Sequence, residues 1–439
     1  MNAHDETLRA FFDGLQDTQW LPREELEAGQ RQQLAHIVHH AARTTPFYKD
    51  RLAPVLRGNS DIDWSRWNEI PILKRSDLHE HRQLLLSQDI PAHHGRTYSV
   101  TSSGTSGEPV TANWTMLAAI PRRAANWRMY EWHNLDFSAE LASCRGVSPW
   151  PEGSVSGYWG PPWHEARGIQ RMISDITPYH RIAEWIGRKQ PRYFSAIPFT
   201  LPAIVEEMQK QRIRNPIACI IGYGGQATSL CRKIVKDTLD ISVVEKYGSE
   251  ECGLIANECN EGSLHVLSEL VLVEVVGEDN EPCPPGVEGR VLVSNLYNTA
   301  QPMIRYELGD IAAFGSPCSC GRSLPVLSPI AGRIKHMFRF PGEPRVAPHD
   351  GRAFKILQPH LDPHWYQIAQ IGATTVEIRF VSKRQPSEDD LRSVREMLPV
   401  AWRNTKAEIV FKQFDTPPKQ KGRKHIVFVN EWEPHLTTG

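Results

Sequence analysis

Two short predicted strands separated by a helical pattern constrain the fold of this chain most strongly. Residues 217–221 form an apolar run that ends at Gly222-Tyr223-Gly224-Gly225, and residues 241–247 supply the next strand. The spacing from Thr228 to Thr238 between them is that of an amphipathic helix, as is the spacing from Pro198 to Gln211 before them. This β-α-β order predicts buried parallel strands, and therefore an α/β fold.

Each of the two predicted strands runs into a segment that contains glycine. Gly224-Gly225-Gln226-Ala227 follows the first strand, and Tyr247-Gly248 ends the second. Open α/β sheets bind ligands beyond the carboxyl ends of their strands. Because neighbouring parallel strands end at the same edge, we expect these two segments to lie at one ligand site.

A second signal for ligand binding is Thr101-Ser102-Ser103-Gly104-Thr105-Ser106-Gly107-Glu108-Pro109, which interleaves five hydroxyl residues with two glycines. Glycine lets the main chain approach an anion and each hydroxyl adds a donor, so the pattern indicates a phosphate-binding loop. A plain surface turn is the alternative. The loop is not a Walker loop, because Glu108-Pro109 stands where the lysine would be. The charge of a bound nucleotide must therefore be met elsewhere.

The rest of the chain predicts more than one domain. With 439 residues it can bury a large core. Apolar spacing predicts a helix over residues 29–42, and residues 269–276 and 289–295 predict an antiparallel, hairpin-rich region. A small β-β-α-β unit is predicted near the C-terminal end, from residues 366–371, 375–381, 387–402 and 408–414.

Composition excludes some partners and favours one compartment. A net charge of -1 argues against nucleic acid or an anionic membrane as a partner held by bulk electrostatics. The chain has no run of 18 apolar residues, and its first residues lack the basic and apolar pattern of a signal peptide. Its eight cysteines are interpreted as reduced thiols, so we expect a cytoplasmic protein. The sequence specifies no oligomeric state.

Four further motifs follow the loop in order: Tyr247-Gly248-Ser249-Glu250-Glu251, the segment Ile304 to Asp310, Gly332-Arg333, and Gly422-Arg423-Lys424. Together with the loop they resemble the adenylate-forming superfamily of acyl-CoA synthetases. The chain is similar to the phenylacetate-CoA ligase branch in three more segments, which are Leu34 to Tyr48, Pro71 to Lys74 and Cys318 to Pro325. The resemblance implies a large, multi-subdomain N-terminal adenylation domain over residues 1–333 and a small, mobile α+β C-terminal lid domain over residues 334–439.

The resemblance also implies an activity. A carboxylic acid would attack the α-phosphate of ATP to give an acyl-adenylate and pyrophosphate, and the acyl group would then pass to coenzyme A. An amine, an alcohol or a protein thiol is an alternative acceptor, because Ile334-Lys335-His336-Met337 departs from the family pattern that helps to position coenzyme A. A nucleotide-binding protein that keeps the fold without turnover is a further alternative.

Roles for single residues follow from the same resemblance. Glu251 is the position that holds Mg²⁺ in the family, and a carboxylate suits that hard cation. Asp310 would accept hydrogen bonds from both ribose hydroxyls, with Arg333 reinforcing the contact. Glu250 stands where the motif usually has Ser or Thr. Gly225, Gln226 and Ala227 resemble the family's adenine-binding segment, with Tyr247 stacking on the base. The full set of expected ATP-binding residues is Ser102, Ser103, Gly104, Thr105, Ser106, Gly107, Gly225, Gln226, Ala227, Tyr247, Gly248, Asp310 and Arg333.

The family carries a catalytic lysine near the C-terminus that contacts the carboxylate and the α-phosphate. Lys424 fits that position best. Lys421 and Lys419 are alternatives, because Arg423 separates Lys424 from the preceding glycine.

Three thiols and one imidazole form another pattern, Cys259-x5-His265 with Cys318-x-Cys320. This donor set matches a closed tetrahedral zinc site, and the Cys-Ser-Cys-Gly turn is typical of the branch. Scattered buried cysteines are the alternative. Cys252, next to Glu251, is expected to pack rather than to act as a nucleophile.

One aromatic-rich segment is the predicted binding pocket of the acyl substrate. Trp150, Tyr158, Trp159 and Trp163 lie where the family places the acid's pocket, which favours an aromatic or bulky acid. Core packing is the alternative role for these side chains.

Overall fold

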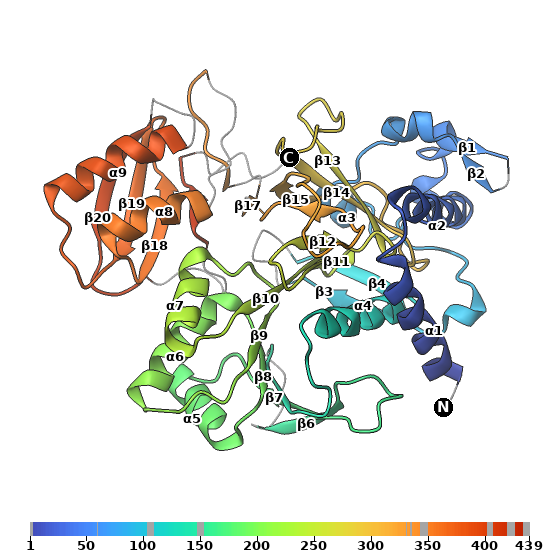
Figure 1. Cartoon of the computed structure of the whole chain (residues 1–439). Coiled ribbons are helices and arrows are strands. Elements are labelled where there is room, and N and C mark those ends of the chain that lie inside the picture. Colours follow the sequence, from blue (N-terminus) through green and yellow to red (C-terminus); the bar gives the residue numbers. More distant parts are fainter. Residues whose placement is uncertain are drawn as a thin grey trace.

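The computed structural model describes residues 3–58, 60–102, 109–146, 153–330, 332–333, 336–342, 350–401, 407–418 and 426–432. A large body carries the elements up to β17, and a smaller unit that contains a sheet lies to one side of it (Figure 1). The predicted mixed α/β fold is confirmed.

The main sheet has nine strands among the described residues, in the order β16-β12-β11-β10-β9-β8-β5-β7-β6. The five strands from β7 to β10 in this order pair in parallel, and the outer ones pair antiparallel. Their bounds are Leu141–Cys144 (β5), Ser154–Tyr158 (β6), Ile169–Ile173 (β7), Tyr193–Ala196 (β8), Cys219–Gly222 (β9), Val243–Ser249 (β10), Gly253–Glu258 (β11), Leu264–Val266 (β12) and Val326–Leu327 (β16).

Both faces of the central parallel strands β5, β8 and β9 are buried, which explains why they carry mostly apolar or small residues. Ile220 of β9 packs against the cluster that includes Ile182 of α5 and Val235 of α7, while Ile221 belongs to the cluster on the other face, with Trp127 of α4. Helices α5, α6 and α7 accordingly lie on one side of the sheet and α4 on the other (Figure 1). These helices span Ala119–Trp132 (α4), Tyr179–Lys189 (α5), Leu201–Lys210 (α6) and Ser229–Leu239 (α7).

The predicted β-α-β order is therefore confirmed within two residues at most boundaries. The helix expected from Pro198 begins as a short 3-10 turn, Pro198–Thr200 (η5), before α6. The helix expected over residues 29–42 lies within a longer one, α2.

The N-terminal elements begin with a helix beside α4 and lead to the hairpin of β3 and β4, which flanks the predicted phosphate loop. Helix α1 packs against α4. These elements span Ala3–Thr18 (α1), Arg23–Thr44 (α2), Pro46–Tyr48 (η1), Ala53–Val55 (η2), Leu56–Arg57 (β1), Asp61–Ile62 (β2), Trp64–Glu69 (η3), Arg75–Glu80 (α3), Ala92–His94 (η4), Thr97–Thr101 (β3) and Thr111–Thr115 (β4).

A second sheet confirms the predicted hairpin-rich region. Its four described strands are antiparallel in the order β13-β14-β15-β17. They span Val271–Val276 (β13), Gly289–Asn295 (β14), Tyr306–Ala312 (β15) and Gly332–Arg333 (β17).

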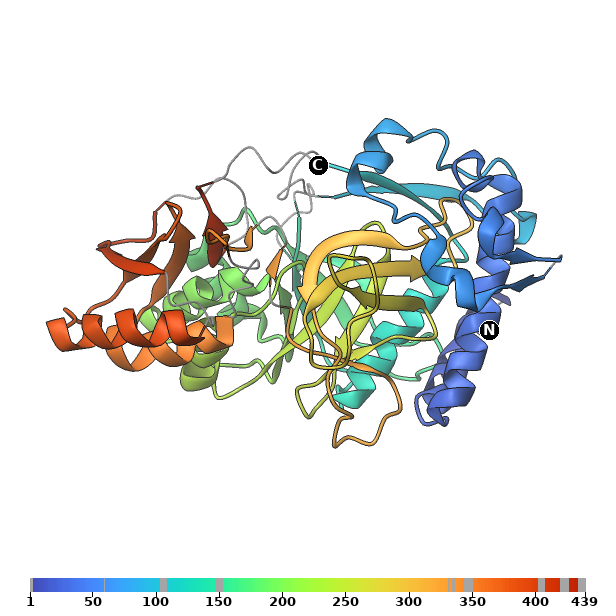
Figure 2. The same cartoon turned by 90° about the horizontal axis from the view of Figure 1, so that it is seen from above.

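The C-terminal unit contains the predicted β-β-α-β order and two elements that we did not predict. Its sheet has the order β20-β19-β18-β21, and its two helices lie side by side against it (Figure 2). Helix α8 was missed because Pro359 interrupts its pattern, and β21 because it has three residues. The elements span Asp350–Leu361 (α8), Trp365–Gln370 (β18), Thr375–Val381 (β19), Glu388–Ala401 (α9), Glu408–Gln413 (β20) and Phe428–Asn430 (β21). Of the helices in the described ranges, none is both long and apolar enough to cross a membrane.

Candidate functional site

The turn between β10 and β11 places Glu251 at the junction of the two large sheets. The strands pair with a bulge between Tyr247 and Gly248. A Cβ atom on Gly248 would lie 2.4 Å from the carbonyl oxygen of Gly253, so this backbone approach requires glycine. Directly after the turn, Cys252 donates its N–H to Ser249 Oγ at 3.0 Å.

Glu251 is buried, with 5% of its surface exposed, and it forms an ion pair with Arg75 of α3. Arg75 Nη1 lies 3.2 Å from Glu251 Oε1, and Arg75 Nη2 lies 3.4 Å from Ser102 Oγ. Ser102 belongs to the start of the predicted phosphate loop, of which residues 103–108 lie outside the described residues, and its Oγ accepts a hydrogen bond from the Val110 N–H at 2.9 Å. The structure thus joins the start of the loop to the predicted magnesium ligand.

Glu250 differs from its neighbour, because it is exposed. Its carbonyl oxygen accepts a hydrogen bond from Trp114 Nε1 at 3.0 Å, which ties the turn to β4. The two glutamates are therefore not a solvated pair.

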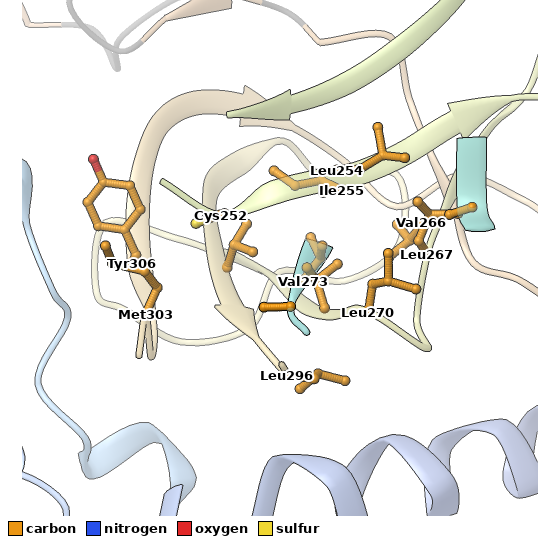
Figure 3. Packing of buried hydrophobic residues seen from close by; sticks show 14 of the residues in the cluster. Cys252, Leu254, Ile255, Val266, Leu267, Leu270, Val273, Leu296, Met303 and Tyr306 are labelled. Atoms are coloured by element: carbon orange, nitrogen blue, oxygen red, sulfur yellow. The ribbon is translucent and has the colours of Figure 1, made fainter. Parts of the chain in front are cut away.

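Cys252 and Tyr306 stand at one end of a buried apolar cluster (Figure 3). Burial raises the pKa of the Cys252 thiol, which supports the expected packing role. The hydroxyl of Tyr306 points away from the other labelled side chains (Figure 3). Burial also raises the pKa of Tyr306, and the Arg75 guanidinium partly opposes this shift.

Tyr247 and Asp310, both predicted to bind ATP, are in contact. Tyr247 Oη donates a hydrogen bond to Asp310 Oδ2 at 2.9 Å. Asp310 is buried in β15 and lies opposite Arg333 of β17 in the strand register. The predicted ribose ligand is thereby placed next to the residue predicted to stack on adenine.

The predicted adenine segment lies between the end of β9 and the start of α7. Gly225 and Gln226 are exposed, while Ala227 is buried and donates its N–H to the Glu245 carboxylate. Burial raises the pKa of Glu245, although Arg232 pairs with that carboxylate at 2.9 Å. Because β9 and β10 are parallel, this segment and Tyr247 lie at the same edge of the sheet, as expected.

The C-terminal unit contacts the helix that follows this segment. Asp350 Oδ2 accepts a hydrogen bond from the N–H of Ser229, the first residue of α7, at 2.6 Å. Leu230 of α7 packs into the apolar core of the C-terminal unit.

Several predicted site residues lie outside the described residues. These are Ser103, Gly104, Thr105, Ser106, Gly107, Trp150, Lys419, Lys421 and Lys424. For Arg333 only the backbone is described. Their roles stay predictions.

The three described aromatic residues of the predicted acyl pocket have different environments. Tyr158 is 57% exposed, whereas Trp159 is buried and packs against Tyr130, Phe137 and Tyr193. Trp163 contacts the rings of Phe12 and Trp127.

Trp163 also lines a hollow of about 560 Å³, which none of the predicted ATP-binding residues lines. The contacts of Trp159 and Trp163 are those of core packing, and the acyl pocket stays a prediction.

The four residues of the predicted zinc site come together. Their ligand atoms, from Cys259, His265, Cys318 and Cys320, all lie within 4.8 Å of one another. Cys259 Sγ lies 3.7 Å from Cys318 Sγ, and Cys320 Sγ lies 3.3 Å from His265 Nε2. We call this group the cysteine-histidine cluster.

The geometry of this cluster fits a tetrahedral cation. At a Zn–S distance of about 2.3 Å, two sulfur ligands are about 3.8 Å apart. His265 Nδ1 lies 3.0 Å from the carbonyl oxygen of Leu324, so a proton on Nδ1 is bound there and Nε2 is left as a metal ligand.

Comparison with known proteins agrees with the motifs. No protein-family model matches the sequence. Phenylacetate-coenzyme A ligase of Thermus thermophilus is 28% identical over 403 residues, which are 85% of this chain and 84% of that protein. Phenylacetate-coenzyme A ligase of Escherichia coli is 23% identical over 78% of both chains. The predicted resemblance to the phenylacetate-CoA ligases is confirmed.

Solved structures support the same fold. The chain superimposes with a TM-score of 0.75 on 2-hydroxyisobutyryl-CoA ligase in the postadenylation state in complex with 2-HIB-AMP. That match has 16% sequence identity and covers 96% of this chain and 92% of the other. The fold is that of the adenylate-forming ligases.

The sequence analysis missed Arg75 as a member of the site. Arg75 lies directly after the segment Pro71 to Lys74, and its spacing from other residues does not indicate a binding role. The available signal was indirect: a phosphate loop without lysine needs a cation from another segment.

Proposed function

We propose that this protein is an AMP-forming ligase that activates a carboxylic acid with ATP and transfers the acyl group to coenzyme A. One observation carries the proposal. Along a chain similar to phenylacetate-CoA ligases over 85% of its length, the fold gathers the motif residues Glu251, Tyr247 and Asp310 around the edge of one sheet. The substrate is a carboxylic acid, and the aromatic-rich segment and the relatives' names favour an aromatic one.

In the first half-reaction an oxygen of the substrate carboxylate attacks the α-phosphorus of ATP. The bond between the α-phosphorus and the oxygen bridging to the β-phosphorus breaks, and pyrophosphate leaves with the electron pair. Because an anion approaches a polyanion, the barrier is mainly electrostatic. Mg²⁺, when bound, neutralises phosphate charge, and Glu251 is the residue that would hold it.

The other proposed site residues orient the nucleotide. Asp310 accepts from the ribose hydroxyls and is itself held by Tyr247 Oη. Gly225, Gln226 and Ala227 bind adenine beside Tyr247. Loop residues Ser102 to Gly107 hold the β- and γ-phosphates, and Lys424 contacts the carboxylate and the α-phosphate.

We place the domain boundary after Arg333, so that the C-terminal unit is the mobile lid. Its contact with α7 supports this role, since Asp350 reaches the helix that follows the adenine segment. Movement of the lid would change the surroundings of the nucleotide between the two half-reactions.

Two further assignments complete the proposal. The cysteine-histidine cluster holds a structural Zn²⁺, which the donor set and spacing support. The cytoplasm is the proposed compartment, because the eight cysteines are all free thiols and a zinc-thiolate site suits a reducing environment.

An amide, ester or protein-thioester ligase is the second candidate. It is favoured by the residues after Arg333, which depart from the family's pattern near the coenzyme A site. The adenylation half-reaction is common to both candidates.

The test is a product analysis with purified protein, ATP, Mg²⁺, phenylacetic acid and related acids, with and without coenzyme A. The proposal predicts AMP, pyrophosphate and an acyl-CoA identified by mass spectrometry. Acid-dependent pyrophosphate without acyl-CoA would favour the second candidate. ATP turnover that is independent of any acid would contradict both.

A further inference from the structure

Arg75 is held in place by the sheet that contains Asp310, the proposed ligand of the ribose hydroxyls. Leu73, two residues before it, donates its N–H to the Arg305 carbonyl at 3.0 Å and accepts from the Glu307 N–H at 2.9 Å. These bonds add the segment to the edge of β15. Arg75 then begins α3, so its backbone position is fixed from both sides.

The guanidinium of Arg75 reaches three parts of the site. It pairs with Glu251 at 3.2 Å, contacts Ser102 Oγ at 3.4 Å and hydrogen-bonds the phenol of Tyr306. Its side chain is 29% exposed, whereas that of Glu251 is 6% exposed. The cation is therefore on the solvent side of the pair, where a ligand can reach it.

The negative charge of a bound nucleotide and of Glu251 would be balanced by such a cation. The Ser/Thr/Gly loop supplies hydroxyl and main-chain donors but no lysine, and Glu251 adds a negative charge beside it. A guanidinium presents paired N–H donors that match phosphate oxygens. Arg75 contacts both the Ser102 hydroxyl of the loop and the predicted magnesium ligand.

We propose that Arg75 is a catalytic residue that binds the β- and γ-phosphates of ATP and then the departing pyrophosphate. The inference rests on the proposed function. The pair with Glu251 opens when the nucleotide binds, so that the carboxylate turns to Mg²⁺ and the guanidinium to the phosphates. As the bond to the bridging oxygen breaks, Arg75 neutralises the negative charge that gathers on the leaving group.

The experiment compares nucleotides that differ only in these phosphates. Affinities for ATP with Mg²⁺ and for AMP are measured by calorimetry for wild type, R75Q and R75K, with R82Q as the matched control. Arg82 is an exposed arginine seven residues further along. Melting temperatures verify that the variants fold, and R75K serves as the second variant if R75Q does not.

A direct phosphate contact predicts that R75Q weakens ATP binding by about tenfold to hundredfold. AMP binding should stay within about twofold, and R75K should lie between R75Q and wild type, because lysine keeps the charge but not the paired donors. R82Q should match wild type. An equal loss for ATP and AMP, or no loss for either, would overturn the proposal.

Repeating the comparison in the E251Q background distinguishes a direct phosphate contact of Arg75 from an effect of Arg75 that acts only through Glu251. If Arg75 contacts the phosphates, R75Q weakens ATP binding further in that background. If it only positions Glu251, the second substitution has no additional effect, which would overturn the direct contact. Wild type that binds ATP but releases no pyrophosphate with any acid would refute the proposed function, while the ATP and AMP comparison would still decide the role of Arg75.

Discussion

The proposed nucleotide site and the cysteine-histidine cluster use opposite arrangements of side chains. In the cluster, four ligand atoms from Cys259, His265, Cys318 and Cys320 converge on one point. In the nucleotide site, the described polar groups pair with one another, Arg75 with Glu251 and Tyr247 with Asp310. A cation bound in the cluster would replace the thiol contacts between ligand atoms that already surround one point, whereas a nucleotide must separate an ion pair and a hydrogen bond to reach its ligands. Loss of the cysteine-histidine cluster should therefore affect stability, and loss of the proposed nucleotide site should affect turnover.

The largest expected effect is that of Glu251→Gln on adenylation. The amide keeps the shape of the side chain but loses the charge that holds Mg²⁺, so acid-dependent pyrophosphate release should fall by about 100-fold or more. Zinc content should stay at the wild-type value. A variant that loses zinc together with activity would show that the two sites are not independent.

Asp310→Ala should have the next largest effect, because it removes a charged acceptor for the ribose hydroxyls. Hydrogen bonds to charged groups contribute about 1.5 to 3 kcal/mol each, so the loss of one of the two bonds alone should lower ATP affinity by roughly tenfold to a hundredfold. Tyr247→Phe is the matched control, since it removes only the hydrogen bond to Asp310. Calorimetry should show a larger loss of ATP affinity in Asp310→Ala than in Tyr247→Phe. Unchanged affinity in Asp310→Ala would contradict the assignment of Asp310 as the ligand of the ribose hydroxyls.

Cys320→Ser tests the other side of the comparison. Removing one of four ligands should reduce bound zinc from about one equivalent to less than a tenth and lower the melting temperature by roughly 5 to 10 °C. Cys283→Ser is the control, because this thiol lies outside the cluster. Elemental analysis and thermal unfolding of both variants decide the matter. Wild-type protein purified without chelator that contains no zinc would refute the metal assignment.

A smaller effect concerns pH and two histidines that lie outside both sites. His40 and His94 both contact Thr299, through its carbonyl oxygen at 2.9 Å and its hydroxyl at 2.8 Å. Burial, followed by the nearby charges of His93, His40 and His36, lowers the pKa of His94 to about 4. Burial likewise lowers the pKa of His40, with Arg43 acting in the same direction and Asp89 opposing it.

The sign of the pH effect follows from these shifts. Between pH 6.5 and pH 4 the unfolded chain binds a proton at residue 94 that the folded chain does not, so this contribution to stability is present above pH 6.5 and is lost as the pH falls toward 4. His94→Gln should therefore show a shallower decline in melting temperature over that range than wild type. Parallel declines would mean that this histidine does not contribute.

The sequence predicted the sheet better than it predicted the side chains around it. Strand β9 was recognisable because its residues are largely buried and its sequence is apolar, and β10 because it begins with the buried pair Val243-Val244 directly after a helical pattern. The cysteine-histidine cluster was recognisable because few roles suit this donor set. Arg75 was missed because its contact with Glu251 joins residues 176 positions apart, and no local pattern reports such a distance.

The aromatic-rich segment shows the same limit from the other direction. Trp159 and Trp163 have the composition of a binding pocket, yet their described contacts are with other core aromatics. Large aromatic side chains serve packing and binding equally well, so composition does not separate the two roles.

The most direct test of the central claim is exchange of labelled pyrophosphate into ATP. The reverse of adenylation forms ATP from pyrophosphate and an enzyme-bound acyl-adenylate, so the label enters ATP only if a carboxylic acid has been activated. The proposed adenylation predicts exchange that requires both Mg²⁺ and an acid, that is fastest with an aromatic acid, and that needs no coenzyme A. Exchange with none of a broad panel of acids, by folded protein that binds ATP, would contradict it.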